Sequence, residues 1–255
     1  MLLAMDMGNT NITIGVFEGD KLRLQARLST DRAKMEDEYA IELMDLFRLY
    51  RLEAGAFTGA ILSSVVPPLN RALCGAVNKV TGLTPLLVGP GTKTGLNLRI
   101  DDPATLGADL LVGAVAAVDK VGTPCIVWDL GTATTVSVVD KNGAYRGGAI
   151  LPGVATGLDS LTARTSMLPG ISVEAPERVI GTNTVACLRS GAVYGNAATI
   201  DGMNERIMAE LGYDAPVVAT GGLGGEIVPF CRIPVTYVEE LLLTGLRILY
   251  EKNCK

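Results

Sequence analysis

The sequence contains no histidine among its 255 residues. Histidine general bases, Ser-His-Asp triads and histidine-ligated metals are therefore excluded, and any chemistry has to use carboxylates, hydroxyls, Lys, Arg or backbone amides. The five cysteines are widely spaced and form no Cys-x-x-Cys pair. This usage indicates reduced thiols in a cytoplasm, and it favours neither a disulfide framework nor a zinc site.

Long apolar segments and clusters of positive charge are also lacking. The longest apolar run, at 110–118, is far too short to cross a bilayer. The first ten residues contain an acid and no basic residue, which is unlike a secretory signal. The net charge is −5, and the 22 basic residues are scattered. We therefore expect a cytoplasmic protein that has neither a membrane nor a nucleic acid as its partner.

A repeated turn is the most informative feature that the sequence does contain. The segments "AMDMGNTN" at 4–11 and "WDLGTATT" at 128–135 each place an Asp, one apolar residue and a Gly at the end of an apolar strand. The offset between the two Asp residues is 123 (129 − 6), close to half of the chain. Without a gap, this offset aligns Asp6 with Asp129, Gly8 with Gly131, Asn9 with Thr132 and Asn11 with Thr134.

The order of the predicted elements also indicates a duplication. Each half begins with three short strands joined by hairpin turns and continues with helices and further strands. One helix is predicted within 31–52 and another at 102–122, with Pro103 in the first turn of the second. Four apolar residues of the first helix have amphipathic spacing: Ala40, Leu43, Met44 and Phe47.

This order resembles the layout of the actin-like ATPases and sugar kinases. We therefore expect an α/β protein with a duplicated ribonuclease H-like (actin-like ATPase) fold. Its two similar halves are predicted at 1–104 and 105–255, with a nucleotide cleft between them.

The two turns have the composition of a phosphate-binding site. A strand that ends in Asp-x-Gly before a hairpin exposes backbone N–H groups that a larger side chain would cover, and each Asp can hold a cation beside phosphates. Neutral donors flank the two glycines: Asn9, Thr10, Asn11, Thr132, Thr134 and Thr135. The alternative is ordinary hairpin chemistry with Asx-turn hydrogen bonds, which one copy of the turn does not exclude. A third glycine-rich segment, "ATGGLGGEI" at 219–227, follows a predicted strand.

Seven segments, taken together and in their order, resemble the type III pantothenate kinases over nearly the whole chain. They are "DMGNTNITIGVF", "SSVVPPL", "DDPATLGADLL", "WDLGTATTVSVVD", "GGAILPG", "GTNTVACLRSGAVYG" and "VVATGGL". The resemblance implies a homodimer that transfers the γ-phosphate of ATP to the primary hydroxyl of pantothenate. It also implies that Mg²⁺ and a monovalent cation, K⁺ or ammonium, are used as cofactors.

The resemblance also implies a role for individual residues. Asp109 matches the general base, Asp129 the monovalent-cation ligand, and Asp6 a position near the Mg²⁺. The nucleotide contacts would be Asp6, Met7, Gly8, Asn9, Thr10, Asn11, Ile12, Thr13, Gly131, Thr132, Gly221 and Gly222. The pantothenate contacts would be Ile100, Gly107, Ala108, Asp109, Leu110 and Thr184. At a helix N-terminus Asp109 would remain ionised, as a base requires, but a first-turn Asp can also merely serve the helix dipole.

Two positions depart from the family pattern. The family usually has Tyr-x-x-Pro before the helix and Gly-x-Asp-Arg within it, whereas this chain has Ile100 in place of the Tyr and Leu110 in place of the Arg. Both changes remove hydrogen-bonding groups from the expected acceptor site and leave the nucleotide motifs intact. Three hypotheses follow: a pantothenate kinase with an altered pocket, a regulatory paralogue, or a kinase or phosphatase for another small molecule.

The predicted apolar helix "TVACLRSGAVYGNAATI", at 184–200, contains small residues and could pack against its copy in a dimer. An internal core helix is the alternative, and the sequence does not distinguish the two.

Overall fold

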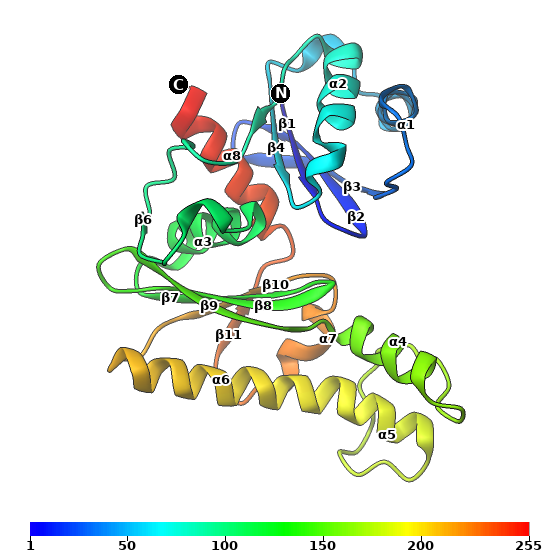
Figure 1. The fold of residues 1–255 in the computed structure, drawn as a ribbon, viewed down its shortest axis with the longest axis vertical. Coiled ribbons are helices and arrows are strands. Elements are labelled where there is room, and N and C mark those ends of the chain that lie inside the picture. The colour runs from blue at the N-terminus through cyan, green and yellow to red at the C-terminus, as the bar shows by residue number, and fades with distance from the viewer. Residues whose placement is uncertain (255) are drawn as a thin grey trace. The chain divides into compact units, whose positions relative to one another are not determined.

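The structure, a computed structural model, describes residues 1–254. It has two mixed sheets, one in each of two compact units (Figure 1). The first unit comprises Met1–Gly95, Asp102–Ala116 and the chain from Leu242 onward, and the second comprises Leu96–Asp101 and Ala117–Leu241. These units are defined by packing, so the division into sequence halves at residue 104 stays a prediction.

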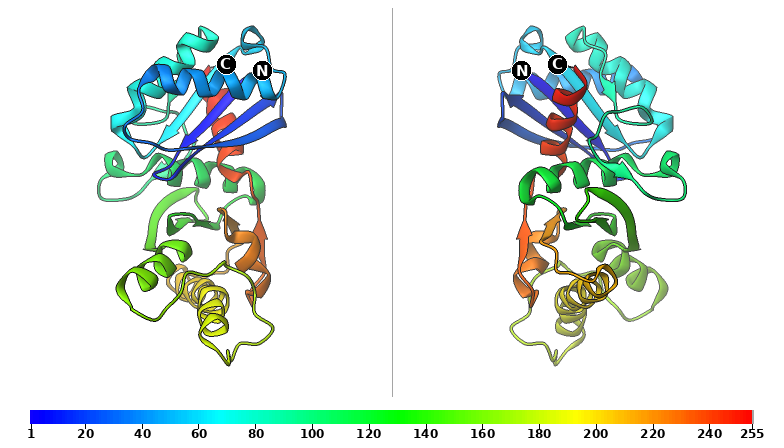
Figure 2. Two further views of the ribbon diagram at one scale, coloured as in Figure 1. Left: turned by 90° about the vertical axis from the view of Figure 1, so that its right-hand side faces the viewer. Right: turned by 90° about the vertical axis from the view of Figure 1, so that its left-hand side faces the viewer.

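The sheet of the first unit has the strand order β3-β2-β1-β4-β5. Its strands are β1 (Leu2–Met7), β2 (Asn11–Glu18), β3 (Lys21–Ser29), β4 (Gly59–Ser64) and β5 (Leu86–Leu87). Because side chains alternate along a strand, Leu3, Met5 and Met7 all enter one hydrophobic core. Helices α1 (Glu36–Leu49) and α2 (Asn70–Thr81) close this core on one side of the sheet (Figure 2).

Helix α1 is shorter than predicted. It begins at Glu36, where the side chain of Glu38 accepts a hydrogen bond from the backbone amide of Met35 at 2.7 Å and so caps the first turn. Of the apolar residues predicted to face the core, Ala40, Leu43 and Phe47 are buried, but Met44 is 56% exposed. That part of the prediction was wrong because the buried stripe passes through Tyr39 and Leu43 instead.

The sheet of the second unit has the order β11-β10-β7-β8-β9-β6. Its strands are β6 (Asn97–Leu98), β7 (Cys125–Leu130), β8 (Ala133–Val139), β9 (Ala144–Pro152), β10 (Val217–Thr220) and β11 (Val235–Tyr237). If β6 is set aside, the order and directions repeat those of the first sheet, strand for strand. The predicted duplication is therefore confirmed.

Strand pairing corrects one detail of the predicted alignment. Asp6 pairs with Thr13 in the first sheet and Asp129 pairs with Thr135 in the second, so the offset after the turn is 122 (135 − 13). A bulge between Val16 and Phe17 recurs between Val138 and Val139 at this same offset. The second turn is thus one residue shorter than the first. Asn11 corresponds to Ala133 and not to Thr134, because an alignment without gaps cannot detect a deletion inside a turn.

The helices of the second unit pack against its sheet, and several of them share one core with residues of β7, β8 and β10. They are α4 (Val154–Arg164), α5 (Thr184–Ser190), a π-helical segment (Gly191–Gly195), α6 (Asn196–Leu211) and α7 (Gly224–Ile227). The indole Nε1 of Trp128 on β7 donates a hydrogen bond to Oδ1 of Asn204 on α6 at 3.2 Å, and both residues are fully buried. Residues of α6 thereby enter the same core as the sheet, as the interpretation of this segment as a core helix requires.

The predicted helix at 102–122 is interrupted. Pro103–Thr105 forms a single 3₁₀ turn, capped by the side chain of Asp102, and α3 (Ala108–Val121) begins only after Gly107. Helix α8 (Leu241–Cys254) lies against the first sheet, where a side chain at Gly15 would collide with Leu243. It also contacts α3 closely, since a Cβ on Gly245 would lie 2.3 Å from the carbonyl oxygen of Val112. Within residues 1–254, none of the helices has the length and apolar character that a bilayer span demands.

Candidate active site

The first repeated turn joins β1 to β2 and is held in place by β3. The amide of Gly8 donates to the carbonyl of Asn11 at 2.9 Å and closes the turn. Thr30, which follows β3, braces it twice: its amide donates to the carbonyl of Thr10 at 2.9 Å, and its hydroxyl donates to the carbonyl of Gly8 at 2.8 Å. The side chains of Asn9, Thr10 and Asn11 are exposed at this position. The turn therefore presents polar groups to solvent on a fixed backbone.

A cationic side chain that the sequence analysis missed lies beside this turn. The Arg32 guanidinium donates to Oδ1 of Asn9 at 3.1 Å. Nothing in the spacing of these two residues, which are 23 positions apart, indicates the contact. Arg32 supplies positive charge and further N–H donors at a turn whose own side chains are neutral, which suits an anionic ligand.

The second repeated turn joins β7 to β8 and has Thr132 at its apex. The amide of Gly131 donates to the carbonyl of Ala133 at 3.1 Å, and the hydroxyl of Thr156 in α4 donates to the carbonyl of Thr132 at 2.7 Å. A Cβ on Gly153, the N-cap of α4, would lie 2.2 Å from the carbonyl oxygen of Thr132. The start of α4 therefore packs directly against the turn backbone.

The third glycine-rich segment supports the same turn from the end of β10. Gly221 has φ +97, and a Cβ at this position would lie 2.5 Å from the backbone nitrogen of Leu130. Its carbonyl accepts a hydrogen bond from the hydroxyl of Tyr237 at 3.0 Å. Gly222 has open space where a Cβ would stand. Only the first of the two predicted glycines is thus required by backbone packing.

Asp109 lies in the first turn of α3, close to where the sequence analysis expected it. Its Oδ1 accepts a hydrogen bond from the amide of Leu110 at 2.8 Å. A side chain on Gly107 would come within 2.5 Å of that same oxygen, so the glycine makes room for the carboxylate. Burial raises the pKa of Asp109 above the ordinary value of 3.8, and hydrogen bonds from the amides of Leu110 and Asp109 offset this only in part. The expectation based on the helix N-terminus alone omitted this desolvation.

The predicted acceptor residues lie on separate segments. Leu110 follows Asp109 in the first turn of α3 and is half-buried. Ile100 lies in the second unit, with its Cγ2 at 3.7 Å from the position of a Cβ on Gly147 of β9. Thr184 is the first residue of α5 and is exposed, and the side chain of Asn183 caps this helix by accepting from the amide of Ala186 at 2.9 Å.

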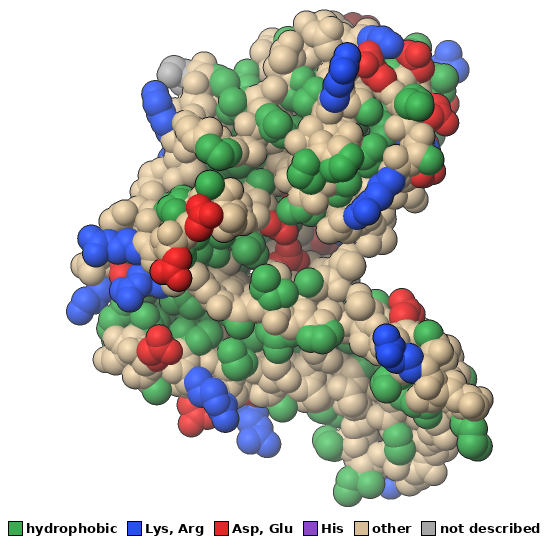
Figure 3. Space-filling view, in the orientation of Figure 1, with side chains coloured by type: hydrophobic (Ala, Val, Ile, Leu, Met, Phe, Trp, Pro, Cys, Tyr) green, Lys and Arg blue, Asp and Glu red, His purple; other side chains and the backbone are tan. Residues whose placement is uncertain are grey.

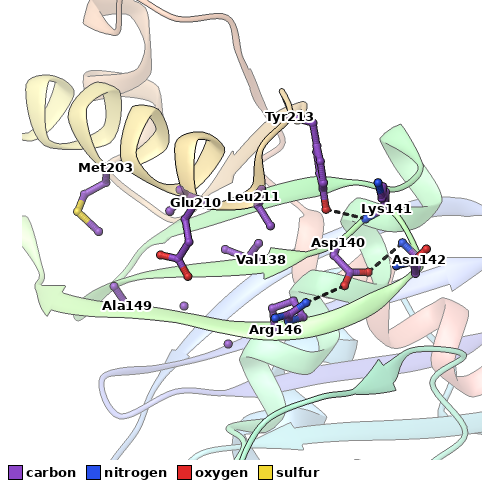
Figure 4. A pocket seen from close by; sticks show the side chains of 13 residues that line it. Val138, Asp140, Lys141, Asn142, Arg146, Ala149, Met203, Glu210, Leu211 and Tyr213 are labelled. Atoms are coloured by element: carbon purple, nitrogen blue, oxygen red, sulfur yellow. Dashed lines mark hydrogen bonds and ion pairs between the residues drawn. The ribbon is translucent and has the colours of Figure 1, made fainter.

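The second unit has a pocket of about 510 Å³ that is separate from the predicted site residues. It lies between the β8–β9 hairpin and the C-terminal part of α6, and none of the predicted site residues lines it (Figure 4). Arg146 pairs with Asp140 there at 3.3 Å. Burial alone would raise the pKa of Asp140, but hydrogen bonds from the amides of Ala144 and Asn142 and from Arg146 outweigh it and lower the pKa. Asp140 therefore closes the hairpin turn and is best understood as a structural residue.

One face of the molecule shows charged side chains of both signs. On the face seen in Figure 3, the Lys and Arg side chains are interspersed with Asp and Glu, and the described residues there form no extended basic surface. Within residues 1–254, no three Asp, Glu, Cys or His side chains are grouped as a metal cage. Mg²⁺ in phosphoryl-transfer sites is commonly held by one or two carboxylates and by phosphate oxygens, so a single Asp at a strand end suffices for such a site.

The repeated five-stranded order and the strand-end turns define the class of protein. The fold resembles that of several solved structures, kinases among them. Component A of (R)-2-hydroxyglutaryl-CoA dehydratase from Acidaminococcus fermentans aligns with a TM-score of 0.58 and 13% identity, covering 100% of this chain and 99% of the other. The inorganic polyphosphate/ATP-glucomannokinase from Arthrobacter aligns with a TM-score of 0.53 and 15% identity, covering 99% of each chain. The chain therefore has the duplicated ribonuclease H-like fold of the actin-like ATPases.

Sequence comparison identifies the family within this class. The type III pantothenate kinase family model matches residues 2–206. A type III pantothenate kinase from Moorella thermoacetica is 44% identical over 253 residues, covering 99% of this chain and 100% of the relative. The one from Geobacter sulfurreducens is 44% identical over 254 residues, covering 99% of each. This chain belongs to the type III pantothenate kinase family.

Proposed function

We propose that the protein catalyses the ATP-dependent phosphorylation of pantothenate, the first step of coenzyme A biosynthesis. The observation that carries this proposal is the 44% identity to the Moorella thermoacetica type III pantothenate kinase over nearly the full length of both chains. The two Asp-x-Gly turns support it, because phosphoryl transfer depends mainly on aligning groups and neutralising charge. The comparisons lend no support to a regulatory paralogue or to a kinase for a different alcohol.

The proposed ATP site consists of the two turns and the third glycine-rich segment. The amides and side chains of Asp6 to Thr13 would bind phosphate oxygens, and Gly131 with Thr132 would do the same from the second turn. Arg32 would add positive charge beside Asn9. Gly221 and Gly222 would lie along the adenosine, and the open space where a Cβ of Gly222 would stand leaves its backbone bare. The hydrogen bond from Thr30 holds the backbone of the first turn, and the close packing of Gly153 holds that of the second. Both contacts support this role, because a preorganised site does not have to be ordered when the ligand binds.

Asp109 is the proposed general base. The carboxylate would accept the proton of the pantothenate hydroxyl as that oxygen attacks the γ-phosphorus, and the leaving oxygen would remain on ADP. A loose transition state lets a weak base act late, so a carboxylate suffices and histidine is not needed. The raised pKa of Asp109 makes it a better proton acceptor than an ordinary Asp while it is ionised.

The carboxylates near the ends of β1 and β7 are suited to binding cations. Asp6 and Asp129 each provide hard carboxylate oxygens at the end of a strand, next to a turn suited to phosphates. We assign Asp6 to the neighbourhood of Mg²⁺ and Asp129 to a monovalent cation, K⁺ or ammonium. A bound Mg²⁺ would neutralise charge on the β- and γ-phosphates and so favour the departure of ADP.

The proposed pantothenate site contains the two unusual residues. Gly107, Ala108, Asp109 and Thr184 would provide its polar and backbone contacts. Ile100 and Leu110 offer apolar surface where the family pattern has a phenol and a guanidinium. One lost hydrogen bond costs about 1–3 kcal/mol, so the altered residues are expected to weaken binding of pantothenate.

The double variant Ile100→Tyr with Leu110→Arg tests this interpretation. Restoring both hydrogen-bonding groups is expected to lower the KM for pantothenate about tenfold or more, with the KM for ATP unchanged. Steady-state kinetics with each substrate varied in turn provides the measurement. A higher KM for pantothenate in the double variant would mean that Ile100 and Leu110 belong to a differently built pocket.

We further propose that the protein is a cytoplasmic homodimer. It would bind its small-molecule substrate and neither a nucleic acid nor a membrane. The dimer is supported by the apolar surface around α4 and α5. Large apolar side chains are exposed along this region: Leu161, Met167, Val179, Ile180 and Val185. In Figure 3, hydrophobic side chains are visible on the surface over these helices. Several large apolar side chains exposed in one region are typical of an interface between proteins.

One assay tests the proposed function. Labelled pantothenate is incubated with ATP and Mg²⁺, with and without K⁺ or ammonium, and phosphopantothenate is quantified. The expected result is formation of phosphopantothenate that requires Mg²⁺ and is stimulated by the monovalent cation. ATP hydrolysis, or transfer to another alcohol but not to pantothenate, would point to a different substrate. The absence of any nucleotide binding would point to a regulatory protein.

A further inference from the structure

A hydroxyl residue lies on each side of both strand-end aspartates. In the first sheet, Asp6 pairs with Thr13 on β2 and with Ser63 on β4. Side chains in register on neighbouring strands point to the same face, about 5 Å apart, so these three residues form a row. The row faces away from the core that contains Met5 and Leu62, because each of these residues is adjacent in its strand to a member of the row.

The second sheet repeats this row. Asp129 pairs with Thr135 on β8 and with Thr220 on β10. The hydroxyl of Thr220 donates to the carbonyl of Glu239 at 3.3 Å, which satisfies it within the protein. The duplication thus places a hydroxyl residue beside the aspartate on the parallel strand in both halves.

Ser63 differs from its counterpart. It is fully buried, with 0% of its surface exposed, and its Oγ has no hydrogen-bond partner in the structure. A buried hydroxyl without a partner is unfavourable, and alanine, with almost the same volume, would avoid this cost. Packing therefore explains a small residue at this position but does not explain a hydroxyl.

We propose that Ser63 is a positioning residue for Asp6. Its hydroxyl donates a hydrogen bond to the Asp6 carboxylate when Mg²⁺·ATP is bound, and this bond holds the carboxylate in the orientation that Mg²⁺ needs. Hydrogen bonds from neighbouring groups commonly orient metal-binding side chains in this way. The inference rests on the proposed function, which supplies both the nucleotide and Mg²⁺. Ser63 is thus assigned to orienting the carboxylate, and it is not proposed as a ligand of the cation.

The variant Ser63→Ala tests the inference by separating stability from ligand binding. Without ligand, its midpoint of thermal unfolding is expected to equal or exceed that of the wild type, because an unpartnered buried hydroxyl is removed. In the presence of Mg²⁺, its Kd for ATP, measured by isothermal titration calorimetry, is expected to rise about tenfold. With EDTA in place of Mg²⁺, the two proteins are expected to bind ATP equally.

Ser64→Ala is the matched control. The Ser64 hydroxyl accepts a hydrogen bond from the amide of Val66 at 3.0 Å, so this variant is expected to lose stability without any Mg²⁺-specific change in ATP binding. An unchanged Kd for Mg²⁺·ATP in Ser63→Ala would overturn the inference, as would an equal loss of affinity with EDTA. Such results, together with normal phosphorylation of pantothenate by the wild type, would leave the proposed function standing. Failure of the wild type to bind ATP would instead refute the function.

Discussion

The variant Asp109→Asn is expected to lower kcat for phosphorylation of pantothenate by about 10²- to 10⁴-fold, the usual contribution of a general base. The affinity for ATP is expected to remain close to that of the wild type, because the nucleotide motifs are on other segments. The amide of Asn keeps the size of the side chain and can still accept from the Leu110 amide, but it cannot accept the substrate proton. Single-turnover kinetics and calorimetric titration with ATP measure the two effects separately.

The raised pKa of Asp109 also gives this prediction a dependence on pH. Burial raises the folded-state pKa of Asp109 above the ordinary value of 3.8, so activity is expected to fall, as pH is lowered, at a higher pH than for an ordinary Asp. The folded state binds this proton more tightly than the unfolded state, and its stability therefore declines as pH rises through the folded pKa. Asp109→Asn is expected to remove that decline and to be at least as stable as the wild type near neutral pH.

Asp119→Asn is the matched control for the base. Asp119 lies near the end of the same helix and is exposed, so the substitution removes the same charge without affecting a buried carboxylate. Its kinetics and its pH dependence are expected to match the wild type. Full activity in Asp109→Asn would exclude Asp109 as the base and would leave it the role of a helix-dipole residue. A loss of stability near neutral pH would mean that the carboxylate is structural.

A second large effect is expected from Gly153→Ala. Gly153 has φ −64, a conformation that alanine adopts without strain, so the effect is purely one of space. The new Cβ would lie 2.2 Å from the carbonyl oxygen of Thr132 and 2.4 Å from that of Gly131, and both are backbone atoms that can yield only if the second turn moves. Overpacking of this kind costs about 1–3 kcal/mol of stability. ATP affinity is expected to fall at least about tenfold with it.

Gly157→Ala, four residues further along in α4, is the matched control and is expected to have the opposite effect on stability. A Cβ at Gly157 would meet nothing within 4 Å, and alanine is favoured over glycine inside a helix by roughly 0.5–1 kcal/mol. This variant is expected to be more stable than the wild type and to bind ATP normally. Thermal unfolding and calorimetric titration of both variants give the comparison. If Gly153→Ala binds ATP as the wild type does, the second turn does not contribute to the nucleotide site.

Much of the fold could be predicted because it depends on local pattern. The three-stranded meanders, the buried strand β10 and the equivalence of Asp6 and Asp129 in the repeat follow from apolar alternation and turn residues, which operate over a few positions. The ends of the helices were predicted less accurately. Helix α1 starts at Glu36, and a break at Leu106–Gly107 precedes α3. Both features depend on capping and on the path of the chain, which a periodic pattern of apolar residues does not reveal.

The sequence by itself determined the duplication, the two Asp-x-Gly turns, the absence of histidine chemistry and the family resemblance, because each is written in the order of residues along the chain. Only the tertiary structure decided which distant residues support those turns. The contact of Arg32 with Asn9, the approach of Gly153 to Thr132 and the register of Ser63 with Asp6 join segments far apart in sequence. They arise from strand order and close packing, which no local pattern encodes, and they show why each turn is held rigid.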